Sequence, residues 1–179
     1  ILAENSHGLI VVDMHAAHER ILYEKMKRQF SEHCMQTQPM LIPINLALSP
    51  QEMVLWELHH DFLNSLGIVT VASGPGSIII REMPCLLKGN AIDVLLKDTL
   101  ADLQSYDSSQ RVEDHIKAIL GNMACRSAIK ANHRLNIPEM HAILRDMEET
   151  PNSGFCNHGR PTWVRWNLKE LDQFFLRGQ

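Results

Sequence analysis

Residue types that commonly serve as metal ligands are concentrated in two short segments of the sequence. The first segment is Asp13-Met14-His15-Ala16-Ala17-His18-Glu19, and the second is Cys156-Asn157-His158-Gly159-Arg160-Pro161. Carboxylate, imidazole and thiolate groups are the ligands of transition metals in proteins, and a hydrolytic site leaves one position open for water or substrate. The two segments therefore predict the two halves of one metal site.

The spacing of the first segment favours a shared ligand face. His15 and Glu19 are four residues apart at the start of a predicted helix, so their side chains project from one face about one turn apart. Asp13 lies two residues earlier, at the end of a predicted strand, from which its carboxylate can reach the same volume. The alternative is an ordinary helix start, where acidic residues stabilise the helix dipole and His15 is polar surface.

Cysteines provide the other candidate ligands. Cys156 and His158 are two residues apart in a glycine-flanked loop, and alternate residues of an extended segment face the same way. Cys125, in a predicted helix with small neighbours, is a further candidate. The alternatives stay open, namely a buried thiol and a surface histidine in the loop, and a core cysteine in the helix.

Glu24 and His18 fall outside the expected ligand set. Glu24 is five residues after Glu19, which places it about 140° around the helix from the shared face. We expect Glu24 to form a salt bridge or to support a ligand. For His18 the sequence indicates no carboxylate partner.

The length and composition of the chain limit the classes of protein to which it can belong. The 179 residues, 45% of them hydrophobic, suffice for one domain or two small lobes. The four cysteines form no Cys-x-x-Cys pair and no secretory segment opens the chain, which favours a reducing, cytoplasmic environment. The chain begins within an apolar segment, so we expect it to be part of a longer polypeptide. No apolar run approaches the ~18 residues of a membrane helix, and no membrane association is expected.

The charge of the chain argues against DNA binding by overall electrostatic attraction. The net charge is −4 and the pI is about 6.2, whereas neutralising phosphates requires clustered Lys and Arg. If the chain acts on DNA, other proteins must bring the DNA to it.

Strand and helix signals follow one another along the chain. Apolar alternation and turn residues predict hairpins at 1–13 and 67–82, an edge strand or extended linker at 38–46, and a strand at 162–166. Helical spacing and the N-cap residues Ser49 and Asn167 predict helices at 16–30, 50–65, 92–104, 111–131, 138–148 and 168–175, with a loop at 105–109. This order predicts an α+β fold of two lobes.

Three motifs, in order along the chain, carry a family resemblance. The pattern Asp-x-His-Ala-x-x-Glu-x-x-x-x-Glu is filled by Asp13, His15, Ala16, Glu19 and Glu24. The second motif is Ala124-Cys125-Arg126, and the third is Cys156-x-His158-Gly159-Arg160-Pro161, with Asn157 where many members have proline. The chain resembles, over essentially its whole length, the C-terminal domain of bacterial MutL-type DNA mismatch-repair endonucleases.

The resemblance implies a particular division of the chain. Residues 1–36 and 115–179 would form a dimerisation lobe, with a mixed sheet and helices, that carries the metal site. Residues 37–114 would form a smaller, inserted regulatory lobe.

The resemblance also implies an activity, which is metal-dependent nicking of one strand of duplex DNA in mismatch repair. Asp13 and Glu19 would be catalytic. One or two divalent ions would bind, with Zn2+ favoured by thiolates and Mn2+ by an oxygen-rich position. The implied ligands are Asp13, His15, Glu19, Cys125, Cys156 and His158, and the supporting residues are Glu24, Arg126 and Arg160. Arg160 is a candidate phosphate contact or a brace for its loop, and ATP is expected only at a separate N-terminal region.

A fourth segment suggests a protein partner. Gln38-Pro39-Met40-Leu41-Ile42-Pro43 is similar to the Gln-x-x-Leu-x-Pro segment through which such domains bind the DNA sliding clamp, with Gln38, Leu41 and Pro43 as contacts. An extended, proline-stiffened peptide loses little entropy on entering a hydrophobic groove. An ordinary edge strand is the alternative, and both can hold.

Further partners and a location follow from the same resemblance. They are a second copy of the chain in a homodimer, a mismatch-recognition protein and, bound weakly, duplex DNA. The location would be the bacterial cytoplasm, at the nucleoid.

Two other functions compete with the nuclease. A non-catalytic, zinc-stabilised dimerisation module is the stronger alternative, because every donor could serve folding alone. A zinc peptidase is disfavoured, because the chain has no His-Glu-x-x-His motif.

Overall fold

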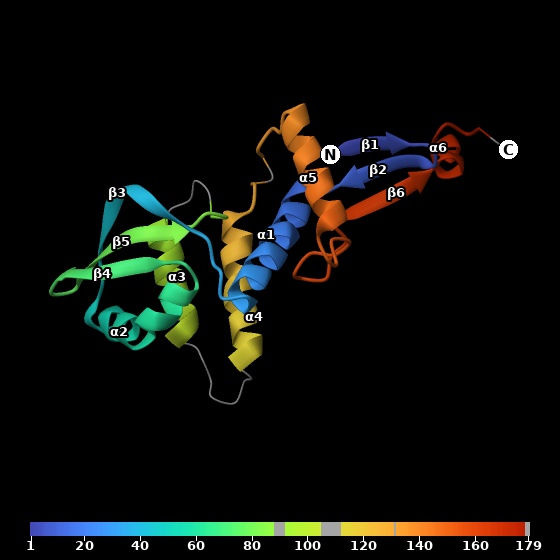
Figure 1. The fold of residues 1–179 in the computed structure, drawn as a ribbon. Coiled ribbons are helices and arrows are strands. Elements are labelled where there is room, and N and C mark those ends of the chain that lie inside the picture. Colours follow the sequence, from blue (N-terminus) through green and yellow to red (C-terminus); the bar gives the residue numbers. More distant parts are fainter. Residues whose placement is uncertain (88–91, 105–111, 131, 178–179) are drawn as a thin grey trace. The chain divides into compact units, whose positions relative to one another are not determined.

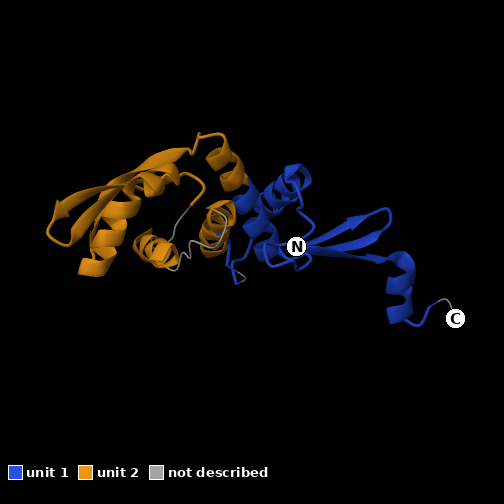
Figure 2. Cartoon of the chain, turned by 90° about the horizontal axis from the view of Figure 1, so that it is seen from below, with its two compact units in different colours: residues 1–24, 128–179 blue, residues 25–127 orange. Residues whose placement is uncertain are grey.

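The computed structural model describes residues 1–87, 92–104, 112–130 and 132–177. Within them lie six helices and two three-stranded sheets, which confirms the α+β class. The chain divides into two compact units, residues 1–24 with 128–179 (unit 1) and residues 25–127 (unit 2), coloured separately in Figure 2. Across the described residues, no helix combines the length and the apolar character that crossing a membrane requires.

The sheet of unit 1 is wholly antiparallel. β1 (Leu2–Asn5) and β2 (Gly8–Val12) form the predicted hairpin, and β6 (Trp163–Asn167) pairs with the other side of β2 (Figure 1). The expectation of a mixed sheet is wrong, because the tight turn forces β1 against β2 and β6 returns antiparallel to β2. Gly8 is required here, since a Cβ atom would lie 2.1 Å from the carbonyl oxygen of Trp166.

Three helices belong wholly or partly to unit 1. α1 (Met14–Ser31) starts directly after β2, and the boundary between the units falls within it. α5 (Ile137–Glu149) packs on the first turns of α1, and α6 (Leu168–Phe174) follows β6 with Asn167 as its N-cap, as predicted. The core that joins β2, α1 and α5 consists of Val12, Ala17, Ile21, Ile143 and Met147. It fixes the start of α1 relative to α5 and to the end of β2.

Unit 2 contains the second sheet, also antiparallel, and three helices. The strands are β3 (Thr37–Ala47), β4 (Val69–Gly74) and β5 (Ser77–Pro84), in the order β3-β5-β4. The helices are α2 (Pro50–Ser65), α3 (Ile92–Gln104) and α4 (Val112–Ser127). Trp56 is buried between helix and sheet, where its indole N–H donates to Thr70 Oγ1 at 2.8 Å. β3 is an edge strand, as one of the two interpretations of its sequence predicted.

The end of one expected helix differs from the structure. α4 ends at Ser127 rather than near residue 131, because both backbone groups of Ile129 bond to side chains of α1 instead of continuing the helix. The compact units meet at 24/25 and 127/128, and the lobe boundaries implied by the resemblance, at 36/37 and 114/115, stay predictions. The expected loop at 105–109 lies outside the described residues, and the roles assigned to the lobes stay predictions.

The capping box of α2 makes a testable contribution to stability. Ser49 Oγ accepts from Glu52 N–H at 3.3 Å, and Glu52 Oε2 accepts from Ser49 N–H at 2.7 Å, which lowers the pKa of Glu52. Ser49→Ala should cost about 1 kcal/mol in the free energy of unfolding. The measurement is urea denaturation followed by the fluorescence of Trp56, with Trp163 and Trp166 replaced by Phe.

The lowered pKa of Glu52 gives this contribution a pH dependence. The stabilisation is complete above the ordinary pKa of glutamate, about 4.3, and is lost as the pH falls through the lowered value. Glu52→Gln should remove this part of the acid sensitivity, whereas Gln51→Ala, on the same exposed turn, should not. Equal acid sensitivity in Glu52→Gln and the unsubstituted chain would contradict the assignment.

Candidate functional site

Asp13 caps the helix that carries the first set of candidate ligands. Asp13 Oδ1 accepts from the backbone N–H groups of His15 at 3.0 Å and Ala16 at 3.1 Å, satisfying two amides at the start of α1. The Asp13 N–H donates to the carbonyl of Thr162 at 2.9 Å. This bond places the start of α1 beside the segment that leads into β6.

Two histidines of α1 form hydrogen bonds with the backbone of the same residue, one with its carbonyl and the other with its N–H. His15 Nδ1 lies 2.7 Å from the carbonyl oxygen of Ile129 and therefore donates to it, while the Ile129 N–H donates to His18 Nδ1 at 3.0 Å. His15 thus carries a proton on Nδ1, which leaves Nε2 as the ring nitrogen that could bind a ligand. A carbonyl that accepts from the second ring nitrogen is the usual support of a metal-binding histidine.

Glu19 is a buried carboxylate with an unsatisfied oxygen. The residue is only 3% exposed, and its Oε1 has no hydrogen-bond partner within the described part of the chain. The imidazole of His158 is nearby, with Nδ1 3.5 Å from Glu19 Oε1, and 65% of its side chain is exposed. A buried carboxylate is costly unless a cation or hydrogen-bond donors compensate it, so the chemistry of this position fits a bound cation.

The Cys156 turn, residues 156–160, presents the second set of candidate ligands. Gly159 N–H donates to the Cys156 carbonyl at 3.0 Å, and Cys156 N–H donates to the Arg160 carbonyl at 2.8 Å. Gly159 has φ +77°, which glycine adopts without strain. The expectation of an extended segment is therefore wrong, because these bonds close a tight turn in which Cys156 is buried and His158 is exposed.

Asn157 and Arg160 of this turn, and Thr162 just after it, differ in whether their polar side-chain atoms form hydrogen bonds. The side-chain amide atoms of Asn157 are buried, and no described residue forms a hydrogen bond with them. The Arg160 side chain is exposed, while its carbonyl closes the turn. Thr162 is fully buried, and its hydroxyl donates to the Ser153 carbonyl. Glu19 and Asn157 are thus two residues of unit 1 whose buried polar atoms form no hydrogen bond with a described residue.

Arg20 connects helix α1 to the Cys156 turn, a role that the sequence did not reveal. Its guanidinium donates to the carbonyls of Phe155 and Cys156 and pairs with Glu24 Oε1 at 3.0 Å. Glu24 is therefore in a salt bridge, as its angle on the helix predicted. The four-residue separation of Arg20 and Glu24 is the signal that could have revealed this pair.

The structure brings only part of the predicted ligand set together. Glu19 and His158 are neighbours, but no three His, Cys, Asp or Glu side chains in the described ranges are arranged to hold a metal ion. Cys125 belongs to unit 2, where Arg126 of the same motif pairs with Asp98. The ligand roles of the six residues stay predictions.

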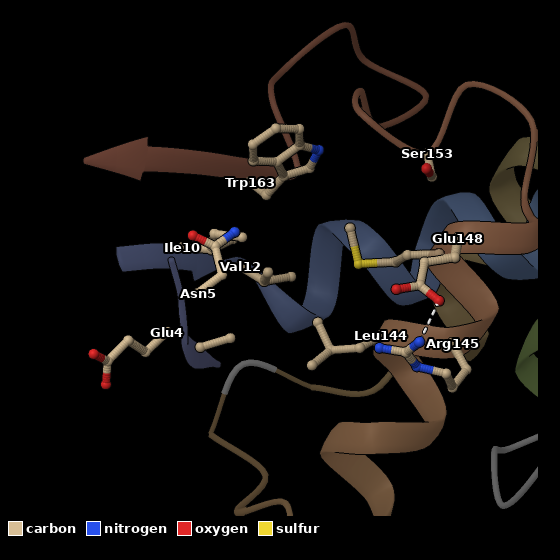
Figure 3. A pocket seen from close by; sticks show the side chains of 11 residues that line it. Glu4, Asn5, Ile10, Val12, Leu144, Arg145, Glu148, Ser153 and Trp163 are labelled. Atoms are coloured by element: carbon tan, nitrogen blue, oxygen red, sulfur yellow. Dashed lines mark ion pairs between the residues drawn. The ribbon is translucent and has the colours of Figure 1, made fainter. Parts of the chain in front are cut away.

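Unit 1 also has a groove, with a volume of 430 Å3, between the sheet and α5. Figure 3 shows Trp163 on one side of it and Leu144 and the Arg145–Glu148 ion pair on the other. None of the predicted metal ligands lines this groove. It is therefore separate from the Glu19–His158 pair.

Comparisons with known proteins establish the family. Residues 1–135 match the family model described as MutL C terminal dimerisation domain. The whole chain is 49% identical to the DNA mismatch repair protein MutL of Coxiella burnetii (strain CbuG_Q212), covering 31% of that protein. It is 50% identical to that of Pseudomonas fluorescens (strain SBW25), covering 28%, and 49% identical to that of Cellvibrio japonicus (strain Ueda107), covering 29%.

The chain belongs to the MutL C-terminal dimerisation domain family. It spans less than a third of the length of these curated relatives. The matched range contains both the Asp13–Glu24 motif and Ala124–Arg126, and the full-length relatives also align with the Cys156 turn.

The buried carboxylate and thiol predict that zinc stabilises the chain. A ligand that binds only the folded state, present at a free concentration 100 times its dissociation constant, adds about 2.7 kcal/mol to the free energy of unfolding. We expect Zn2+ to raise the melting temperature, EDTA to reverse the rise, and Cys156→Ser to lose most of it. Cys34→Ser, which replaces an exposed cysteine of unit 2, is the matched control. An equal rise in Cys156→Ser and the unsubstituted chain would rule Cys156 out as a ligand.

Proposed function

We propose that this chain is the metal-dependent endonuclease and self-association domain of a DNA mismatch-repair protein. Its relatives carry the name DNA mismatch repair protein MutL. The observation that supports a metal-dependent activity is the buried Glu19 carboxylate, whose Oε1 lacks a hydrogen-bond partner in the described structure and faces His158 at 3.5 Å. The reaction proposed is hydrolysis of one phosphodiester bond, which nicks one strand of a duplex.

The residues proposed to hold the divalent ions are those of the three motifs. They are Asp13, His15, Glu19, Cys125, Cys156 and His158. A bound divalent cation supplies Lewis-acid chemistry, polarising a phosphoryl oxygen and increasing the acidity of water. The thiolates favour Zn2+, and a position richer in oxygen favours Mn2+. His15 is already oriented by its bond to Ile129, and Cys156 by the bonds within its turn.

The acidic character of the chain fits an enzyme whose access to DNA is controlled. A net charge of −4 gives the chain little general affinity for phosphate. We propose that a mismatch-recognition protein, the sliding clamp and an ATP-binding region outside this chain position it on DNA. Such a requirement would limit nicking at unintended places.

The predicted clamp-binding segment is exposed on the edge strand of unit 2. Pro39 pairs with Glu82 and Ile44 with Ile80, so five steps along β3 correspond to two along β5. The register of the two strands therefore shifts across this segment, and Leu41 is 98% exposed. A protruding apolar side chain on a proline-flanked edge strand supports the proposal that this segment enters a hydrophobic groove of the clamp.

The self-association surface proposed is the strand and helix at the end of unit 1. Its apolar side chains are exposed in a single chain, although apolar side chains of this size normally lie in a core or an interface. They are Trp163, Val164, Trp166, Leu168, Phe174 and Phe175. A second copy of the chain would bury them, in agreement with the name of the family.

One observation favours a second candidate function, a zinc-stabilised dimerisation module without catalysis. Asp13 already has a structural task, because its Oδ1 caps α1. In that case the carboxylate would be needed for folding alone, and the metal would only stabilise the domain.

Asp13→Asn separates the two candidates, because asparagine caps a helix about as well as aspartate. The substitution should leave folding and self-association intact and lower the nicking of supercoiled plasmid with Mn2+ at least about 100-fold, the usual scale for a catalytic carboxylate. Asp13→Ala should also lose about 1 kcal/mol of stability with the cap. A non-catalytic module would show no nicking even when unsubstituted. Equal nicking by Asp13→Asn would exclude a catalytic role.

Clamp dependence gives a separate prediction. Loaded clamp should increase nicking by the unsubstituted chain, and Leu41→Ala should abolish this increase without changing nicking in the absence of clamp. Leu58→Ala is the control, since Leu58 is also an exposed leucine of unit 2, at 73%. Equal nicking with and without clamp would contradict licensing by the clamp.

A further inference from the structure

Arg20 makes three polar contacts that connect two parts of unit 1. Its Nε donates to the Phe155 carbonyl at 2.7 Å and its Nη2 to the Cys156 carbonyl at 2.9 Å. Its Nη1 donates to Glu24 Oε1 at 3.0 Å, and the two side chains are only 14% and 12% exposed. The guanidinium therefore lies in a position with little solvent exposure, between α1 and the start of the Cys156 turn.

The geometry of these bonds fixes the distance between helix α1 and the backbone at Cys156. A guanidinium is planar and presents its N–H donors in a rigid fork. Because the two carbonyls belong to consecutive residues, one of them Cys156 itself, the backbone at the thiol is held at a set position against α1. Glu19 immediately precedes Arg20 on that helix. Arg20 thus links the buried carboxylate to the turn that carries the thiol and His158.

Glu24 has a defined part in this arrangement. A largely buried guanidinium needs a counter-charge, and Glu24 supplies it from one turn further along the same helix. The Arg20 guanidinium also lies 5.5 Å from the centre of the Tyr23 ring, within cation–π range. These contacts orient the fork towards the two carbonyls.

We propose that Arg20 is a positioning residue of the candidate metal site, held by Glu24, and that it sets the placement of Cys156 and His158 relative to Glu19. The inference rests on the proposed function, because it assigns Arg20 to the placement of metal ligands. Arg20 acts in this proposal through its bonds to Phe155, Cys156 and Glu24, and no metal-ligand role is assigned to it. Lysine cannot replace it, since one ammonium does not reproduce a planar fork that reaches two carbonyls and a carboxylate.

The test compares Arg20→Lys, the milder Glu24→Gln and the control Arg28→Lys, which changes an exposed arginine further along the same helix. The first measurement is Co2+ titration of the 179-residue chain, followed by the thiolate-to-cobalt absorption band. The second is amide hydrogen exchange at Cys156 and Gly159 in the metal-free chain.

We expect Arg20→Lys to weaken Co2+ binding about 10- to 100-fold, the usual effect of removing support from a ligand, and to speed exchange in the turn. Glu24→Gln should act in the same direction with a smaller effect, and Arg28→Lys should match the unsubstituted chain in both measurements. If Arg20→Lys does not fold, Glu24→Gln carries the test.

Each contrary result has a distinct meaning. Unchanged Co2+ affinity in Arg20→Lys and Glu24→Gln, with a normal band in the unsubstituted chain, would overturn the positioning role. Unchanged exchange in the turn would overturn it as well. Absence of the thiolate band in the unsubstituted chain would instead overturn the proposed metal site, and the role of Arg20 in ligand placement with it.

Discussion

The candidate site in unit 1 depends on one buried carboxylate oxygen, which forms no hydrogen bond with any residue that the structure describes. Removing an ionised carboxylate from water costs several kcal/mol unless positive charge or donors replace the lost hydration. Glu19 has one such oxygen, and the group that faces it is the imidazole of His158, 3.5 Å away. A divalent cation held by these two groups would compensate the charge. The same cation would supply the Lewis acid that phosphodiester hydrolysis needs.

Several independent contacts keep Glu19 in place. The Asp13 side chain caps α1, and its N–H bonds to Thr162, so the helix starts at a defined point beside β6. The apolar core with α5 fixes the inner face of the helix, and both polar groups of Ile129 bond to histidines of α1. Arg20, the residue after Glu19 on the helix, bonds to the Cys156 turn. Residues at the start of α1 that look catalytic therefore also perform structural tasks, and substitutions must separate the two.

Local signals predicted the elements well, because they depend on residues close in sequence. Ser49 with Pro50 and Glu52 forms a capping box, and the helix that it opens has the predicted extent. The contacts that shape the site join residues far apart, such as Arg20 and Cys156, and no local pattern encodes them. For the same reason the sequence did not reveal that β6 pairs with β2, or that Cys156 lies in a tight turn. Glu24 was placed correctly, because its angle on the helix depends only on sequence spacing.

The most direct test of the account is the position of zinc in a crystal of the chain. Diffraction data collected on both sides of the zinc absorption edge should give an anomalous peak within bonding distance, about 2.0 to 2.3 Å, of the Glu19 carboxylate, the His158 imidazole and the Cys156 thiol. A crystal with zinc bound only at exposed histidines such as His7, and none beside Glu19, would contradict the account.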